Sequence, residues 1–386
     1  MTGIAGCLAL AAGTRPDPEW ARRAAWRTAH RGPDDDGVFA DARAALSARR
    51  LAVIDPSPGG RQPLRSADGR FVMVFDGVIC NYPELARELR AKGISVRGAS
   101  DAEVLLAAYA LRGKDVLRML RGMYAFAIWD AREAELFCAR DPFGQKPLYY
   151  AVTEGQLRFS SERIGLTAPG DASSNLDPDA LRRYLSFQYV PAPLTMTPPA
   201  RFLPPGHFLV ARPGSKIDVF RYWRPSLRPS RSPAAETPER ILDALRDSVT
   251  MHLRADVPVG AFLSGGVDSA AICALAAETK PDTITFTAGF DVPGYNEIGP
   301  ARETAAALGM RNIACLITPK EFVKRLPQIV WHLGDPLADA AAVPLWFAAR
   351  LARKHVGVVL SGEGADELFG GYAVYHQHAA VRAAAS

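Results

Sequence analysis

A glycine loop in the last third of the chain carries the clearest chemistry. Residues 264–269 read SGGVDS, follow an apolar run and open a segment with helical periodicity. Adjacent glycines let a backbone turn tightly and approach an anion, and the amides at a helix start favour bound phosphate. Ser264 and Ser269 add hydroxyl donors, and Asp268 is suited to hold Mg²⁺ against phosphates. Since no lysine follows the glycines, this is not a Walker A motif, and a plain turn with an aspartate cap is the alternative.

A second loop of similar composition lies about one hundred residues later. Residues 361–367 read SGEGADE, follow the apolar run 358–360 and open another helical segment. Carboxylates at a helix N-terminus stabilise the helix dipole, so capping alone is one explanation. In open α/β sheets, however, ligands bind at the carboxyl ends of the parallel strands. Two such loops are therefore predicted to converge on one nucleotide and its metal ion.

The elements that must position these loops alternate along the second half of the chain. Short apolar runs alternate with helix-period segments, and this order is typical of a parallel sheet covered on both faces. The predicted strands are 257–263, 283–287 and 357–360, and the predicted helices are 268–279, 299–308 and 343–355.

The first two hundred residues have a different texture, with strands and few helices. Residues 71–75 and 124–129 are short runs rich in aromatic residues, and residues 101–110 have a helical pattern with Ser100 or Asp101 as the N-cap. A stretch rich in Pro, Arg and Ser follows and is predicted to be a linker. The predicted division is a mostly β domain, a linker and an α/β domain at 1–212, 213–236 and 237–386.

Composition excludes several classes of protein. The 386 residues suit two or three domains, and the net charge of +5 comes mostly from dispersed arginines, which predicts no nucleic-acid partner. The five cysteines form no Cys-x-x-Cys pair, so a reducing compartment is expected. Without an 18-residue apolar stretch or a signal pattern, we expect a cytoplasmic protein with no membrane partner.

The two loops together resemble a known family. SGGVDS followed by SGEGADELFGGY is similar to the synthetase domain of the glutamine-dependent asparagine synthetases. The resemblance implies an ATP pyrophosphatase that adenylates a carboxylate, with ATP and Mg²⁺ as cofactors, Asp268 and Asp366 on the metal and Glu363 as the general base. The ATP and pyrophosphate contacts that it implies are Phe262, Ser264, Gly265, Gly266, Asp268, Ser269, Ala288, Ser361 and Gly362.

The first half resembles the same family through motifs that occur in the same order. They include HRGPDD at 30–35, RLAVID at 50–55, ARDPFG at 139–144 and KPLYY at 146–150. The resemblance implies a four-layer α/β/β/α sandwich of the N-terminal-nucleophile hydrolase type, which releases ammonia from glutamine. It also implies that the second domain is an α/β parallel-sheet ATP pyrophosphatase.

The glutaminase residues depart from the family pattern at two positions. Thr2 stands at the nucleophile position where the family has cysteine, and a hydroxyl is a weaker nucleophile than a thiolate. Asp76, followed by Gly77, replaces the asparagine that helps to form the oxyanion hole, and a carboxylate repels a developing oxyanion. Arg50 and Asp101, which bind glutamine in the family, remain. We therefore expect glutamine hydrolysis to be lost or very weak.

Three functions fit this pattern. The first is an asparagine-synthetase-like ligase that takes a carboxylate, aspartate by family, with glutamine or ammonia. Relatives that have lost the glutaminase cysteine, the β-lactam synthetases and lasso-peptide cyclases, join the carboxylate to an amine of the same substrate, but the β-lactam branch has a tyrosine where Glu363 stands. The family continues beyond the position of Ser386, so we expect an incomplete synthetase domain, with a homodimer or a separate chain as possible partners. The third function is a non-catalytic nucleotide-binding remnant.

Overall fold

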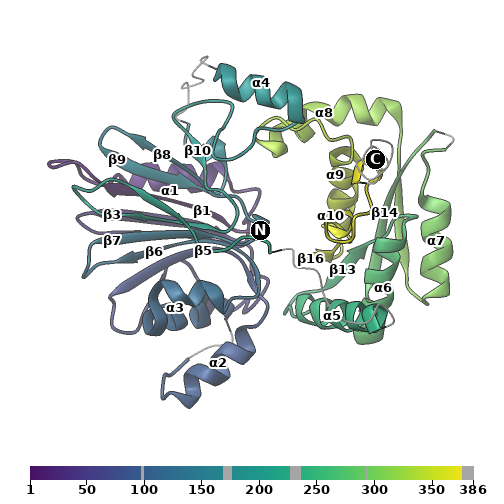
Figure 1. The fold of residues 1–386 in the computed structure, drawn as a ribbon, viewed down its shortest axis with the longest axis horizontal. Helices are drawn as coiled ribbons and strands as arrows, with labels where there is room; N and C mark the ends of the chain where they lie inside the picture. Colours follow the sequence, from purple (N-terminus) through teal and green to yellow (C-terminus); the bar gives the residue numbers. More distant parts are fainter. Residues whose placement is uncertain (97–99, 168–175, 227–235, 293, 376–386) are drawn as a thin grey trace, which may run out of the picture. The chain divides into compact units, whose positions relative to one another are not determined.

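The computed structural model describes residues 1–96, 100–167, 176–226, 236–292 and 294–375. The chain folds into two compact units (Figure 1). The first unit comprises Met1–Pro229 with Val330–Asp339, and the second comprises Ser230–Ile329 with Ala340–Ser386. Within the described ranges, no helix has the length and apolar character needed to span a membrane.

The first unit is built on two six-stranded antiparallel sheets. The first sheet has the order β10-β8-β9-β1-β3-β2, with strands Arg201–Phe202, Tyr149–Thr153, Gln156–Ser160, Gly3–Ala9, Ala44–Arg50 and Asp35–Ala40. The second has the order β12-β11-β7-β6-β5-β4, with strands Asp218–Arg221, His207–Ala211, Glu135–Arg140, Gly122–Asp130, Phe71–Ile79 and Leu64–Arg65. β1 and β5 lie inside their sheets, so they place Thr2 and Asp76 within the sandwich.

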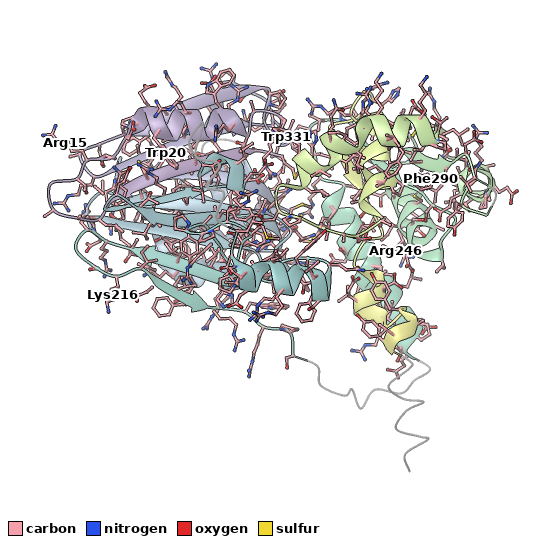
Figure 2. All side chains as sticks on the ribbon, turned by 90° about the horizontal axis from the view of Figure 1, so that it is seen from above. Arg15, Trp20, Lys216, Arg246, Phe290 and Trp331 are labelled. Atoms are coloured by element: carbon pink, nitrogen blue, oxygen red, sulfur yellow. The ribbon has the colours of Figure 1, made fainter. Side chains whose placement is uncertain are left out.

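Apolar side chains fill the space between the two sheets. Ile4 and Leu8 of the first sheet and Val72, Val74 and Trp129 of the second belong to one buried cluster. Helix α1 (Pro18–Arg27) packs on β1 and β3, and its Trp20 is buried with the Arg158 guanidinium 5.0 Å from its ring (Figure 2). Helices α2 (Tyr82–Ala91) and α3 (Asp101–Arg112) cover the second sheet. These four layers confirm the predicted N-terminal-nucleophile hydrolase sandwich.

Ser100 occupies the N-cap of α3, as predicted, although its side chain makes no capping hydrogen bond and the Asp101 carboxylate accepts the Ala102 N–H. One detail of this unit differs from the sequence predictions. The predicted linker 213–236 contains strand β12, which pairs with β11 and extends the first unit beyond residue 212. The predicted strands 71–75 and 124–129 lie inside β5 and β6 as expected. The unit also contains helix α4 (Pro178–Phe187). Short 3₁₀ turns lie at Pro58–Gly60, Gly113–Arg118 and Arg163–Gly165.

The second unit contains a four-stranded parallel sheet in the order β15-β14-β13-β16. Its strands are Asn312–Ile317, Ile284–Phe290, Val259–Phe262 and Val358–Leu360. Its helices are α5 (Thr237–His252), α6 (Val267–Thr279), α7 (Ile298–Ala307), α9 (Ala342–Ala352) and α10 (Ala365–Phe369). Helix α8 is Pro319–Leu333. The predicted alternation and parallel sheet are therefore confirmed, with β15 as an additional strand.

Candidate functional site

The two glycine loops lie side by side in the second unit. They follow β13 and β16, which pair in parallel register with Ala261 opposite Leu360. Gly362 packs against the start of α6, and a Cβ added to it would lie 3.0 Å from the carbonyl carbon of Asp268 and from the amide nitrogen of Ser269. These neighbours are backbone atoms that cannot rotate away. Glycine at 362 therefore permits the close approach of the two loops.

The first loop is shaped by its own serines. The Ser269 Oγ accepts a hydrogen bond from the Ser264 N–H at 3.0 Å, and the Ser264 Oγ accepts one from the Gly266 N–H at 3.1 Å. The two hydroxyls are also 2.9 Å apart. Both side chains therefore hold the turn in shape, in addition to the predicted role as phosphate donors.

Asp268 does not cap the helix that it begins. Helix α6 starts at Val267 with Gly266 as its N-cap, and no side chain caps it. Asp268 lies exposed in the first turn, and no described residue forms an ion pair or hydrogen bond with its carboxylate. The capping alternative therefore does not describe this residue, and its carboxylate is available to a ligand.

The second loop also exposes carboxylates. Glu363 is exposed, its N–H donates to the Ser361 Oγ at 3.2 Å, and Asp366 lies partly buried in the first turn of α10. Gly371 packs against Asp366, where a Cβ would lie 2.1 Å from Oδ1. Over the described part of the chain, no group of three or more His, Cys, Asp or Glu side chains could hold a metal. Mg²⁺ commonly takes one or two carboxylates plus substrate phosphates, so Asp268 and Asp366 fit this ion with a nucleotide present.

The predicted adenosine contacts lie at the same edge of this sheet. Phe262 ends β13 and pairs with Phe286 of β14, so Ala288 follows two residues further along β14. The Thr287 hydroxyl donates to the Leu263 carbonyl at 2.7 Å, which ties the two strand ends together. Phe262, Ala288 and both loops therefore share the carboxyl edge of the parallel sheet.

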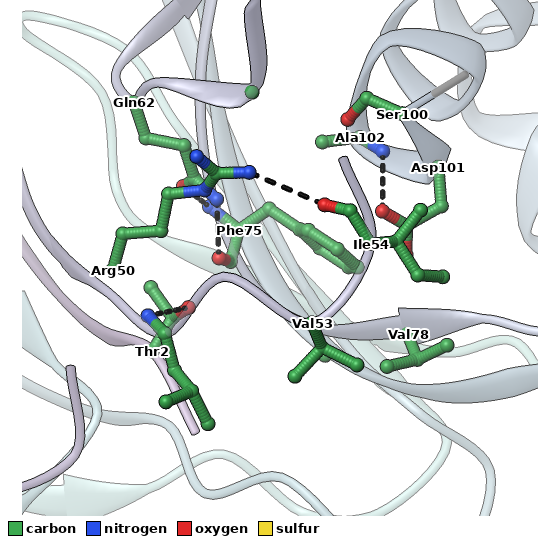
Figure 3. A pocket seen from close by; sticks show the side chains of 13 residues that line it. Thr2, Arg50, Val53, Ile54, Gln62, Phe75, Val78, Ser100, Asp101 and Ala102 are labelled. Atoms are coloured by element: carbon green, nitrogen blue, oxygen red, sulfur yellow. Dashed lines mark hydrogen bonds between the residues drawn. The ribbon is translucent and has the colours of Figure 1, made fainter. Parts of the chain in front are cut away.

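A separate pocket lies in the first unit (Figure 3). Four of the residues predicted for glutamine binding and hydrolysis line it, namely Thr2, Arg50, Gly77 and Asp101. Gln62, Phe75, Val78 and Ser100 are among the other lining residues. The structure thus brings together positions that are up to 99 residues apart in the sequence, from Thr2 to Asp101.

Asp76 is withdrawn from this pocket into an ion pair. Its side chain is fully buried, its Oδ2 lies 2.6 Å from the Arg31 Nη2, and its Oδ1 accepts the Thr2 N–H at 3.0 Å. Arg31 also donates to the Thr2 carbonyl at 3.1 Å and to the Glu162 Oε1 at 3.1 Å. Burial lowers the pKa of Arg31, but the two carboxylates outweigh burial and raise it. The Asp76 side chain is therefore held by Arg31 and carries no N–H to offer an oxyanion.

Arg50 and Asp101 are also engaged by the protein itself. The Arg50 guanidinium donates to the carbonyls of Ile54, at 3.2 Å, and Asp55. The Asp101 carboxylate accepts the N–H groups of Ile79 and Ala102, each at 2.9 Å. Burial raises the pKa of Asp101 to about 6, although these hydrogen bonds oppose the change. The charged groups that the family uses for glutamine are thus present but already hydrogen-bonded.

Three residues around Asp76 were not predicted as site residues. They are Arg31, Glu162 and the buried Lys146, whose pKa is lowered by burial. The signal that could have found Arg31 is Asp76 itself, because a buried carboxylate requires a partner of opposite charge. Arg31 belongs to the HRGPDD motif, one of the family-like segments.

Family models match both units. The model described as "Glutamine amidotransferase domain" matches residues 1–223, and the model described as "Asparagine synthase" matches residues 240–386. The chain belongs to the asparagine synthetase family. Within this family, the chain is 47% identical over 349 residues to asparagine synthetase [glutamine-hydrolyzing] 1 of Bacillus subtilis, covering 90% of this chain and 55% of that protein.

Other similar proteins extend this comparison. A putative asparagine synthetase [glutamine-hydrolyzing] of Mycobacterium bovis is 44% identical over 99% of this chain and 62% of its own length. Amidase chyE of Penicillium rubens is 32% identical over 89% of this chain and 53% of its own length. The chain thus spans between about half and two thirds of the length of these relatives. Among solved structures, a glutamine phosphoribosylpyrophosphate amidotransferase from B. subtilis aligns over 81% of this chain and 65% of its own, at TM-score 0.43 and 17% identity.

Proposed function

We propose that the second unit carries the ATP-dependent activation step of an amide ligase of the asparagine synthetase type. A carboxylate oxygen of the substrate, aspartate by default, attacks the α-phosphorus of ATP. The bond to the β-phosphate breaks, and an acyl-adenylate and pyrophosphate form. The observation that supports this proposal is the contact of Gly362 with the Asp268–Ser269 peptide, which joins two phosphate-suited loops at one sheet edge.

Each group of this edge has a role in the proposal. The amides of Gly265 and Gly266, at the start of α6, bind pyrophosphate oxygens. Asp268 and Asp366 hold Mg²⁺, which neutralises phosphate charge when bound. Glu363, exposed on the second loop, accepts a proton from the amine that attacks the acyl carbon and displaces AMP.

The amine enters this reaction as ammonia rather than from glutamine hydrolysed by the first unit. Thr2 offers a hydroxyl in place of a thiol, and its N–H is bonded to Asp76 at 3.0 Å. The family's asparagine donor is a carboxylate here, and loss of one oxyanion donor costs roughly 10²–10³-fold in rate. Glutamine hydrolysis by this chain is therefore expected to be negligible, and Thr2→Cys combined with Asp76→Asn is expected to restore part of it.

ATP–pyrophosphate exchange tests the proposed activation step. The full chain is incubated with labelled pyrophosphate, Mg-ATP and single candidate acids: aspartate, glutamate, a β-amino acid or a peptide. Exchange that depends on aspartate supports the proposal, whereas exchange only with a β-amino acid or a peptide points to a ligase that uses an amine of the same substrate. Tight ATP binding without exchange for any acid would contradict catalysis by this chain. Ammonia release from glutamine, measured in parallel, would contradict the proposed loss of hydrolysis if it were robust.

A further inference from the structure

The environment of Thr2 departs from what an N-terminal nucleophile requires. In such an enzyme the free α-amine of the first residue acts as the base that takes the hydroxyl proton, so it must be neutral. In the structure the Thr2 nitrogen belongs to the Met1–Thr2 peptide, and its N–H donates to the Asp76 Oδ1 at 3.0 Å. Thr2 and Asp76 are both buried, so water screens this contact little.

Buried charges of both signs surround this contact. Asp76 and Glu162 both bind the guanidinium of Arg31, at 2.6 Å and 3.1 Å, and the buried Lys146 is a further cation near Asp76. The His30 Nε2 lies 2.9 Å from the same Glu162 Oε1. A positive charge on the Thr2 nitrogen, which is formed when Met1 is absent, would give Asp76 a cationic partner at hydrogen-bond distance in addition to Arg31.

We propose that Asp76, held by Arg31, binds the α-ammonium of Thr2 in a buried ion pair. Thr2 then stabilises the fold instead of acting as a nucleophile. The inference deepens the proposed loss of glutamine hydrolysis by naming its cause in the first unit. An amine held as ammonium has no lone pair to receive the hydroxyl proton. The Thr2 Oγ also accepts the Leu51 N–H at 3.3 Å (Figure 3).

Several other charged groups act on this amine. Arg31 and Lys146 are cations, and burial of the amine also favours its neutral form. Glu162, with His30 beside it, acts through Arg31, while Arg50 and Asp101 line the pocket on the other side. The native protein and an Asp76→Asn variant have all of these groups in common. The difference in the pKa of the Thr2 amine between the two proteins therefore gives the contribution of the Asp76 charge.

The direct test is a titration of the Thr2 amine. The full chain is produced with Thr2 as its first residue by cleavage of a removable N-terminal fusion, is checked by intact mass, and carries ¹³C-labelled threonine. The chemical shift of the Thr2 Cβ is followed against pH in the native protein and in Asp76→Asn. We expect the pKa of the amine to be lower in Asp76→Asn by about one unit or more, because an opposite charge at hydrogen-bond distance shifts a pKa by roughly 1–3 units. The variant retains a partner for Arg31, since Glu162 lies 3.1 Å from it.

A matched carboxylate serves as the control. Asp36→Asn removes an acid of β2, in the same sheet as β1, whose described partner is Arg49 rather than Thr2. It should leave the pKa of the amine unchanged. Equal pKa values in the native protein and Asp76→Asn would overturn the proposed ion pair, whatever the outcome of the ATP–pyrophosphate exchange.

A second measurement needs no substitution. The free energy of unfolding is compared for chains that begin at Thr2 and at Met1, as a function of pH. An amine whose pKa is raised on folding stabilises the fold below its unfolded pKa, near 8, and this contribution is lost as the pH rises through the folded value. The advantage of the Thr2 chain should therefore shrink at alkaline pH. A difference that is absent, or constant with pH, would also overturn the proposal.

Discussion

The acidic side chains of the two candidate sites differ in exposure and in hydrogen bonding. In the second unit, Asp268 and Glu363 are exposed at a sheet edge. In the first unit, Asp76 and Asp101 are buried, and each of their four carboxylate oxygens accepts a hydrogen bond from the protein. Carboxylates that the protein leaves available can bind a ligand, whereas carboxylates that it saturates stabilise its own backbone. The difference supports the proposal that ligand binding is kept in the second unit and glutamine hydrolysis is lost in the first.

Removal of a metal-suited acid should produce the largest effect. Asp268→Asn is expected to lower ATP–pyrophosphate exchange by about 10³-fold, because the phosphates lose the charge stabilisation of a bound Mg²⁺. The control is Asp282→Asn, an exposed acid just before β14 and therefore at the opposite edge of the sheet. Equal losses in both variants would show that the carboxyl edge has no special role.

The second effect separates the two half-reactions. Glu363→Gln should lower amide formation by about 10²-fold, the low end of general base catalysis, and should leave ATP–pyrophosphate exchange close to native. Product formation and exchange are measured on the same preparation. A parallel loss of both activities would place Glu363 in nucleotide binding rather than in proton transfer.

A smaller effect tests the contact of the two loops. Gly362→Ala places a Cβ 3.0 Å from backbone atoms of Asp268 and Ser269, so one loop must shift. We expect the affinity for Mg-ATP to fall by about tenfold and the free energy of unfolding to fall by roughly 1–3 kcal/mol. Gly299→Ala in α7 is the matched control, since its added Cβ meets no atom within 4 Å. Native affinity in Gly362→Ala would contradict a site formed by both loops.

The last effect concerns the buried, hydrogen-bonded acids of the first unit. The pKa of Asp101 rises from 3.8 to about 6 on burial, so the folded state holds a proton that the unfolded state has released between these values. The free energy of unfolding of the native protein should therefore decrease by about 2–3 kcal/mol from pH ~4 to pH ~6 relative to Asp101→Asn, which does not titrate.

The control for this pH dependence lies in the same helix. Ala108→Gly removes no charge and should cost roughly 1 kcal/mol at every pH. Denaturant unfolding at several pH values measures all three proteins. If the free energy of unfolding changed with pH equally in the native protein and in Asp101→Asn, burial would not raise the pKa of Asp101.

Much of the second unit could be predicted because its signals are local. Apolar runs, helical periodicity and glycine loops lie within short stretches, and β13, β14, β16 and α6 appear where the pattern indicated. The sequence did not predict β15, which lies at the edge of the sheet. All but one of its residues are partly or fully exposed, and such a strand has a weaker apolar pattern. The shape-giving role of Ser264 and Ser269 also required coordinates, because a hydroxyl suits a turn and a phosphate equally well.

The first unit was harder to predict where charges meet across long separations. The sequence showed that Asp76 replaces a neutral amide, and repulsion of an oxyanion followed from its charge alone. It could not show that Arg31, 45 residues away, binds this carboxylate, or that the Arg50 guanidinium faces the Ile54 carbonyl. Such pairings depend on the register of strands and the packing of loops. The strand at 218–221 was likewise hidden in a stretch with the composition of a linker.

In this proposal the second unit binds the nucleotide and the first unit plays no part in the binding. The decisive experiment is a calorimetric titration of Mg-ATP into the full chain, with Asp268→Asn and Asp76→Asn measured alongside. We expect one binding event in the native protein, abolished or strongly weakened by Asp268→Asn and unchanged by Asp76→Asn. Absence of binding at millimolar ATP, or binding that survives Asp268→Asn and is lost in Asp76→Asn, would contradict it.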